Sequence, residues 1–249
     1  MKIYAIADLH LAISTPDKRM DVFGGRWEKY MEKIAQTWRA TCNDNDVIII
    51  AGDISWAMSL ENIKEDFAFL DELPGRKVCF KGNHDYWWTT LTKLERYKVE
   101  NELEDIFFIH NNCYVAGDTA ICGSRGWILP EDKKFSKEDI KIYERELARL
   151  RLSLEDAKKM NTKQIVVAFH YPPFSMIDGE VRASIFIDML KEYGVEKCVF
   201  GHIHATDRQF DIWCEAAAKA SLEMGMDISL VSADYLNFKP VLLVDDNEL

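Results

Sequence analysis

Five short apolar runs, each followed at once by a polar motif, recur along this chain. They are rich in Val, Ile and Phe and cover residues 3–7, 47–51, 78–80, 165–169 and 199–200. Runs of this length and composition are typical of strands buried on both faces of a sheet. In open α/β sheets, ligands bind beyond the carboxyl ends of the strands, where loops converge. We therefore expect an α/β fold in which five strand ends present polar side chains to one place.

The motifs behind these runs contain five of the six histidines, together with Asp and Asn. In order they are Asp8-Leu9-His10, Gly52-Asp53, Gly82-Asn83-His84-Asp85, His170 before Tyr171-Pro172, and Gly201-His202-Ile203-His204. Imidazole and carboxylate groups together suit divalent transition metals such as manganese, iron and zinc. The seven candidate ligands are Asp8, His10, Asp53, Asn83, His170, His202 and His204. One tetrahedral ion cannot use them all, whereas two ions roughly 3.5–4 Å apart that share one carboxylate can.

The motif set resembles the signature of the calcineurin-like metallophosphoesterase superfamily, which consists of D-x-H, G-D, G-N-H-D/E, H and G-H-x-H. All five blocks occur between residues 8 and 204, so the resemblance covers most of the chain. It implies a four-layer α/β/β/α sandwich with a dinuclear metal site at the strand carboxyl ends. The segment that begins at Gly52 lacks the G-D-x-x-D-R-G extension of protein Ser/Thr phosphatases, which argues against phosphoprotein substrates.

The resemblance also implies a role for each motif side chain. One metal would be held by Asp8, His10 and His204. The other metal would be held by Asn83, His170 and His202, with Asp53 as the bridge between the two. His84 would stay unligated, contact the phosphate or the leaving oxygen, and act as the catalytic general acid. The implied reaction is hydrolysis of a phosphate ester by a hydroxide held between the metals.

Composition indicates a single domain over residues 1–249. The chain is 48 % hydrophobic, its glycines and prolines are scattered, and no stretch resembles a linker. No apolar run approaches the roughly 20 residues that cross a bilayer, and the amino terminus leads straight into the first strand, so we expect neither a membrane anchor nor a signal peptide. The six cysteines form no Cys-x-x-Cys pair. A reducing, cytoplasmic location is therefore the expectation.

The charge balance bears on the partners. The formal net charge is −11, and no cluster of Lys and Arg interleaved with aromatic residues occurs. Binding to duplex nucleic acid depends on neutralisation of phosphates by such side chains, so we expect a small-molecule phosphate ester instead. The acidity by itself is explained by solubility. The oligomeric state is left open.

Apolar residues at three- and four-residue steps predict helices near residues 27–38, 60–70 and 91–97, and residues 214–225 are also expected to be helical. Short strands are expected at 106–109, 114–116 and 120–122, as a meander in a second sheet. The tail is expected to return to strand at 227–231 and 241–244, with the last segment closing that second sheet.

A long helix is predicted at about residues 136–160. Ser136 and Asp139 form a capping-box pattern, and the apolar positions that follow repeat at alternating three- and four-residue steps. Such a seam suits either a dimerisation or cap helix, or an amphipathic helix that lies on its own sheet. We favour the second interpretation, because three heptads fall short of a stable coiled coil.

Other side chains near the motifs have less certain roles. The aromatic residues close to them either line a substrate pocket or pack in the core; they are Trp56, Tyr86, Trp87, Trp88 and Tyr171. Arg125 either clamps a phosphate or serves as a structural charge. Asp85 either orients His84 or caps the next helix. His110 matches no motif and is expected to have no function.

The predicted function is hydrolysis of a small-molecule phosphate monoester or diester with two divalent transition-metal ions (manganese, iron or zinc). One alternative is a nuclease of the same superfamily, which the acidic balance argues against. A second is a non-catalytic scaffold of metallophosphoesterase type. Scaffolds of that type lose ligands or the catalytic histidine, whereas all seven ligands and His84 are present in this chain.

Overall fold

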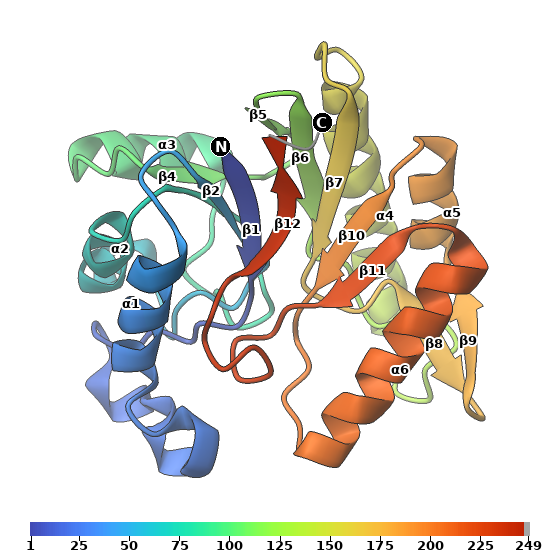
Figure 1. The fold of residues 1–249 in the computed structure, drawn as a ribbon, viewed down its shortest axis with the longest axis horizontal. Coiled ribbons are helices and arrows are strands. Elements are labelled where there is room, and N and C mark those ends of the chain that lie inside the picture. Colours follow the sequence, from blue (N-terminus) through green and yellow to red (C-terminus); the bar gives the residue numbers. More distant parts are fainter. Residues whose placement is uncertain (247–249) are drawn as a thin grey trace.

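Two five-stranded sheets form the centre of the molecule, of which the computed structural model describes residues 1–246 (Figure 1). The first sheet has the order β12-β1-β2-β3-β4, and its strands in chain order are Lys2–Ile6 (β1), Val47–Ile50 (β2), Arg76–Cys79 (β3), Ile106–Phe108 (β4) and Val241–Asp245 (β12). The second sheet has the order β11-β10-β7-β6-β5, with strands Tyr114–Ala116 (β5), Thr119–Ser124 (β6), Gln164–Phe169 (β7), Lys197–Phe200 (β10) and Asp227–Leu230 (β11). β12, at one edge of the first sheet, is antiparallel to its neighbour, and so is β5, at one edge of the second sheet. The other strands of each sheet run parallel to one another.

Helices cover the outer faces of both sheets (Figure 1). The first sheet is covered by Tyr30–Thr41 (α1), Lys64–Asp71 (α2) and Leu91–Glu100 (α3). The second is covered by Lys137–Ala157 (α4), Ile185–Glu192 (α5) and Asp207–Met224 (α6). Short 3-10 turns lie at Pro16–Lys18, Met20–Phe23, Gly25–Trp27 and Leu60–Asn62. Within residues 1–246, no helix combines the length and apolarity needed to span a bilayer.

The four layers follow from the alternation of side chains along the buried strands. Successive residues of a strand point to opposite faces of its sheet. In β1, Ile3 packs between the two sheets, while Tyr4 packs against the helices of the first sheet. In β7, Val166 and Val167 divide in the same way between the inner core and the helices of the second sheet. The predicted α/β/β/α sandwich is confirmed.

The long helix α4 lies on its own sheet, as we favoured. Ser136 and Asp139 form the predicted capping box at its amino end. Its buried side chains include Tyr143, Leu150 and Leu154, which join the core beneath the second sheet. Because this apolar stripe already packs on β6 and against α5, the stripe is not left free for a partner helix.

Two predicted strands belong to the other sheet. β4 was expected in the second sheet but pairs in parallel with β3 in the first. The crossover through α3 explains this, because a strand that follows a helical crossover usually returns beside the strand it left. β12 was expected to close the second sheet but pairs antiparallel with β1. Apolar composition predicts that a strand exists, but not which strand becomes its neighbour.

Four elements between residues 174 and 224 differ from the expectations. The hairpin Phe174–Ile177 (β8) and Glu180–Ala183 (β9) was not predicted. Its signal is the pair Asp178-Gly179, which has positive φ at both residues (52° and 80°), as tight hairpin turns require. α5 was not predicted either. The helix expected at 214–225 is confirmed, but α6 begins earlier, at a capping box formed by Thr206 and Gln209.

Candidate metal centre

All seven predicted ligands lie just beyond the carboxyl ends of parallel strands. β1 leads to Asp8 and His10, and β2 leads to Asp53. Asn83 follows β3. On the second sheet, His170 directly follows β7, and the last motif follows β10. Both sheets therefore contribute side chains to one centre, and the hydrogen bonds between these residues join positions up to 194 apart in sequence.

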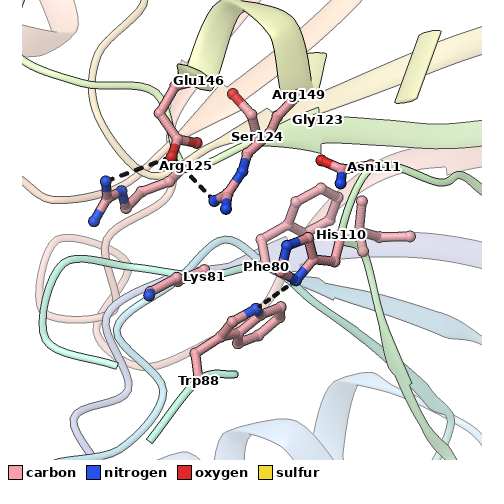
Figure 2. Close-up of a pocket in the computed structure, with 11 residues that line it drawn as sticks. Phe80, Lys81, Trp88, His110, Asn111, Gly123, Ser124, Arg125, Glu146 and Arg149 are labelled. Atoms are coloured by element: carbon pink, nitrogen blue, oxygen red, sulfur yellow. Dashed lines mark hydrogen bonds and ion pairs between the residues drawn. The ribbon is translucent and has the colours of Figure 1, made fainter. Parts of the chain in front are cut away.

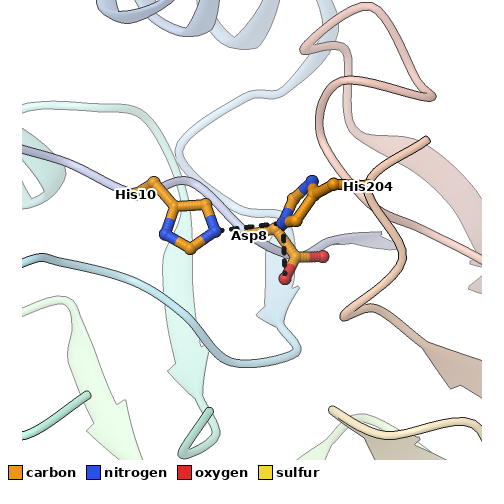
Figure 3. Close-up of side chains that lie close together, drawn as sticks. All are labelled: Asp8, His10 and His204. Atoms are coloured by element: carbon orange, nitrogen blue, oxygen red, sulfur yellow. Dashed lines mark hydrogen bonds and ion pairs between the residues drawn. The ribbon is translucent and has the colours of Figure 1, made fainter. Parts of the chain in front are cut away.

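The first ligand group consists of Asp8, His10 and His204 (Figure 3). The Nε2 atoms of His10 and His204 are 3.0 Å apart. His204 Nε2 is 3.6 Å from Asp8 Oδ1. Ligand atoms of the three residues all lie within 4.8 Å of one another, which is close enough for one ion to contact all three.

The second ligand group consists of Asn83, His170 and His202. Nε2 of His170 lies 2.7 Å from Asn83 Oδ1 and 3.3 Å from His202 Nδ1. Asp53 lies between the two groups, because its Oδ2 is 3.4 Å from His170 Nε2 and 3.8 Å from His10 Nε2. Asp8, Asp53 and His170 also offer donor atoms within 4.8 Å of one another, so Asp8 lies close to both groups. The division of the ligands between two metals, with Asp53 as the bridge, stays a prediction.

The backbone of the site is held in unusual conformations. Asp8, His10, Asp53 and His202 all have positive φ, between 47° and 71°. Positive φ is uncommon for residues other than glycine and often marks functional sites. The motif glycines allow close packing: a Cβ on Gly82 would lie 2.0 Å from Asp53 Oδ1, and one on Gly201 would lie 2.6 Å from Asp8 Oδ2. These motifs thus specify backbone geometry as well as ligands.

Buried negative charge dominates the site. Burial raises the pKa of the Asp8 carboxyl, but the neighbouring His204 and His170 outweigh that effect and hold it below its usual range. Burial also raises the pKa of Asp53, but the neighbouring His170 and His10 outweigh that effect and hold the pKa well below its usual range. Both carboxylates are therefore ionised although Asp8 is completely buried and Asp53 nearly so.

The histidines divide into two kinds. Burial lowers the pKa of His204, but the charge of Asp8 and a hydrogen bond to Asp234 raise it to about 10. Burial also opposes protonation of His170, yet Asp53 raises its pKa above the usual value. Burial lowers the pKa values of His10 and His202 to about 4. Protons on two histidines thus balance the two carboxylates.

These features fit divalent cations. Metal ligands must give up their protons, and bound cations would replace the protons that His204 and His170 carry. The outer ring nitrogens are already engaged: His204 Nδ1 donates to Asp234 Oδ1 at 3.0 Å, and His170 Nδ1 lies 3.2 Å from the carbonyl oxygen of Ala51. Such bonds fix the tautomer that leaves Nε2 free for a metal. Mixed nitrogen and oxygen donors suit transition metals.

Asp234 is a functional candidate that the sequence analysis missed. It is 2 % exposed and lies shortly after β11, so it belongs to a sixth strand end. The signal was the sequence Ser232-Ala233-Asp234, which follows the apolar end of a predicted strand in the same way as the other motifs. Ser232 also forms a bridge with Ala7, beside Asp8.

Asp85 organises the loops of the site, so both predicted roles were wrong. It accepts hydrogen bonds from the backbone N–H groups of Asp53, Ile54, Ser55 and Gly82, and from the indole of Trp87. It neither bonds to His84 nor caps α3, whose N-cap residue is Thr90. Burial, followed by the charge of Asp53, raises the pKa of Asp85 to about 7. This carboxyl ties the Gly52 and Gly82 loops together.

His84 lies beside the ligands and is half-buried. Its backbone N–H donates to Asp53 Oδ1 at 2.8 Å, and its ring centroid is 5.8 Å from that of His10. Its Nδ1 is buried and has no hydrogen-bond partner among the described residues. The ring therefore reaches the edge of the centre without joining either ligand group.

The five aromatic candidates divide between site and core. Trp56 stacks on His10 at a centroid distance of 4.9 Å and lies 4.5 Å from His84. Tyr171 packs on His202 at 4.1 Å. Trp87 and Trp88 are 2 % and 7 % exposed and belong to the core beneath the first sheet. The remaining candidate, Tyr86, is exposed and 6.2 Å from His84.

Arg125 is a structural charge, the second of its two predicted roles. Arg125 and Arg149 both contact the fully buried Glu146, at 3.5 and 3.1 Å (Figure 2). The guanidinium of Arg125 also lies 4.3 Å from the ring centre of Trp127. Arg125, Glu146 and Arg149 line a small cavity that His110 and Trp88 also line. There, Nδ1 of His110 accepts a hydrogen bond from the indole of Trp88 at 3.1 Å.

Comparisons with known proteins support one family. The family model described as calcineurin-like phosphoesterase matches residues 1–206. A comparison with curated proteins found no match to this sequence. Among solved structures, phosphopantetheinyl hydrolase from Mycobacterium tuberculosis is similar, with a TM-score of 0.57 and 15% identity over 100% of this chain and 97% of that one. A protein of unknown function from Aquifex aeolicus has a TM-score of 0.50 and 14% identity over 97% and 95%. These two similarities concern the fold.

Proposed function

The chain belongs to the calcineurin-like phosphoesterase family, and we propose that it hydrolyses a small-molecule phosphate monoester or diester with two divalent transition-metal ions. The observation that carries the proposal is the convergence of seven nitrogen and oxygen donors, from five strand ends, around two buried carboxylates. Manganese, iron and zinc are the candidate metals, because the donor set is mixed. All six cysteines are free, which agrees with a cytoplasmic location.

Each ligand group would hold one ion, and Asp53 would contact both. Bound there, the two cations would supply positive charge to the phosphoryl oxygens and make water a better nucleophile at neutral pH. Asp234 would keep His204 in the tautomer that presents Nε2, and the carbonyl oxygen of Ala51 would do the same for His170. Asp85 would hold the loops that carry Asp53 and Asn83 at a fixed separation.

His84 would donate a proton to the departing oxygen. Its Nδ1 is buried, so we assign the donating proton to Nε2. Trp56, which packs against both His84 and His10, would hold the ring in place and exclude water from one side. A positioned acid of this kind contributes about 10²–10⁴-fold in rate.

A phosphopantetheinyl ester is one substrate to test first, because a phosphopantetheinyl hydrolase shares the fold over the whole chain. Its 15% identity leaves other phosphate esters equally open. A nuclease remains the alternative within the family, although the net charge of −11 disfavours polyanionic substrates.

A substrate panel with controlled metal content tests the proposal. The protein is stripped with chelator and then supplied with manganese, zinc or iron(II) before assay against monoesters, diesters, nucleotides and single-stranded DNA. We expect hydrolysis of small esters that depends on added metal, at about two ions per chain by elemental analysis. Activity that survives complete removal of metal would overturn the two-metal proposal, and activity confined to DNA would favour the nuclease.

A further inference from the structure

Two neighbouring cavities that share lining residues open beside the candidate metal centre. The larger has a volume of about 610 Å³ and the smaller about 240 Å³. Both are lined by His202, Ile203 and Trp213, and the smaller also reaches His204. A histidine of the second ligand group, His202, therefore lines the larger cavity, and a histidine of the first, His204, lines the smaller one. Its volume falls within the range of about 300–1,000 Å³ that is usual for small-molecule sites.

The walls of the larger cavity are mainly apolar. They include Trp127, Leu129, Phe174, Met176, Ile177 and Trp213. These residues come from three places: the loop after β6, the strand β8, and the helix α6. An apolar wall of this extent favours burial of hydrocarbon, at about 0.8 kcal/mol for each methylene.

One wall is fixed before any ligand arrives. The indole N–H of Trp127 donates to Asp139 Oδ1 at 2.8 Å, and the Arg125 guanidinium covers the ring. Tyr171 packs against Trp127 at 5.1 Å and against His202 at 4.1 Å. A continuous aromatic surface thus joins the cavity wall to a predicted metal ligand, so a group bound along it would begin at the metal centre.

The charged rim offers no site for a second anionic group. Its ionisable side chains are exposed, and they are Glu131, Asp132, Asp178, Lys133 and Lys134. Three acids against two bases give no excess of positive charge. Recognition of a second phosphate normally requires such an excess, with Arg or Lys side chains placed to contact it. The cavity therefore favours an uncharged occupant.

We propose that the larger cavity binds an uncharged, largely apolar organic substituent of the substrate, so that the preferred substrate is an amphiphilic phosphate ester. The inference rests on the proposed phosphoesterase function and adds the substrate class. Trp213, which lines both cavities, lies beyond residue 206, where the family match ends. This wall is thus supplied by a part of the chain outside the family match.

Substrates of graded chain length test the proposal. One series is linear alkyl phosphates from methyl to octyl, assayed by release of phosphate. The other is p-nitrophenyl alkyl phosphates of the same lengths, assayed by release of nitrophenolate, which covers a diesterase. We expect kcat/KM to rise by up to about fourfold for each methylene until the chain fills the cavity. A terminal carboxylate or ammonium on the octyl chain should remove most of the gain.

Two variants and a matched control locate the effect. Trp213→Ala removes a wall, and Met176→Lys places a charge in it; each should lower the octyl-to-methyl ratio of kcat/KM at least about fivefold. Leu222→Ala is the control, because Leu222 lies on the same helix, is 87 % exposed and lines neither cavity. Its ratio should equal that of the wild type.

The binding of alkylphosphonates tests the cavity assignment without any need for turnover. Octylphosphonate, which cannot be hydrolysed, should bind the wild-type protein more tightly than methylphosphonate by calorimetry, and Met176→Lys should remove the difference. Equal binding of the two phosphonates, or hydrolysis that is independent of chain length, would overturn the cavity assignment and leave the phosphoesterase intact. No hydrolysis of any ester with any of the three metals would overturn the proposed function and this inference together.

Discussion

The two ligand groups of the candidate metal centre are supported in different ways. In the first group, His204 is partly exposed and its outer nitrogen bonds to a carboxylate, Asp234. In the second group, His170 is fully buried and its outer nitrogen lies against a backbone carbonyl, while His202 is covered by the ring of Tyr171. His204 is therefore supported by a charged partner, and His170 and His202 are supported by burial, a neutral carbonyl group and a ring contact.

This difference affects the protonation of the two histidines in the last motif, His202 and His204. The pKa of His204 is raised to about 10, whereas burial lowers that of His202 to about 4. A metal entering the first group must displace the His204 proton, and one entering the second must displace the His170 proton, whereas His10 and His202 offer neutral rings. Two residues of one motif, separated by Ile203, thus meet opposite environments. We expect metal affinity to rise with pH in both groups, because each contains one histidine that must lose a proton.

The largest effect should come from the residue that both groups share. Asp53→Asn should lose metal from both groups and lower activity on the order of 10⁴-fold, because a neutral amide cannot bridge two cations as a carboxylate does. Elemental analysis and turnover measure the two effects. Asp46→Asn is the control: Asp46 is also buried but bonds to Lys2 and Asn43, away from the centre. An active Asp53→Asn protein with two metals would contradict the bridging role of Asp53.

The next effect concerns a residue that belongs to neither group. His84→Ala should retain both metals while turnover of an alkyl ester falls by about 10³-fold. The loss should shrink for a nitrophenyl ester, since nitrophenolate leaves without a proton. His170→Ala should instead weaken one metal and slow both substrates alike. If His84→Ala slows both esters equally with its metals in place, the acid role fails; if it loses metal, the ligand assignment fails.

Removal of the metals tests both groups together. Ions that bind only the folded state stabilise it by about 2.7 kcal/mol at 100-fold over the dissociation constant. For a chain of this size that corresponds to a rise in Tm of about 5–11 °C. Manganese should raise Tm and chelator should lower it, whereas magnesium, which prefers all-oxygen ligands, should have less effect. A Tm that responds to neither manganese nor chelator would contradict the site.

The smallest effect should separate the groups. Asp234→Asn should weaken metal binding in the first group by about 10–100-fold and leave the second unchanged. Calorimetric titration should then show one altered and one unaltered binding event, and the wild-type affinity of the first group should rise with pH towards 10, as the His204 proton is lost. Tyr171→Phe, which keeps the ring on His202, is the control. Equal weakening of both events by Asp234→Asn would mean that the groups are not independent.

All seven candidate ligands could be predicted from the sequence because their signals are local. A strand that is buried on both faces is visible as a short apolar run, and Asp, His or Asn directly after it needs no knowledge of distant residues. Asp234 was missed although it follows a strand in the same way, because Ser232-Ala233-Asp234 matches no motif. Asp85 was predicted to orient His84 or to cap the next helix, but its partners are four backbone N–H groups from two loops and the indole of Trp87.

The sequence by itself determined which residues are candidate ligands, the approximate positions of ten of the twelve strands in the described residues, and that α4 is a capped amphipathic helix. Each depends on residue type and spacing over a few positions. The tertiary structure alone decided that β4 and β12 join the first sheet, that Asp234 supports His204, and that Trp213 closes a cavity beside His202. These outcomes depend on pairing between segments far apart in the chain, which is set by the packing of the whole core and leaves no mark in any one stretch of sequence.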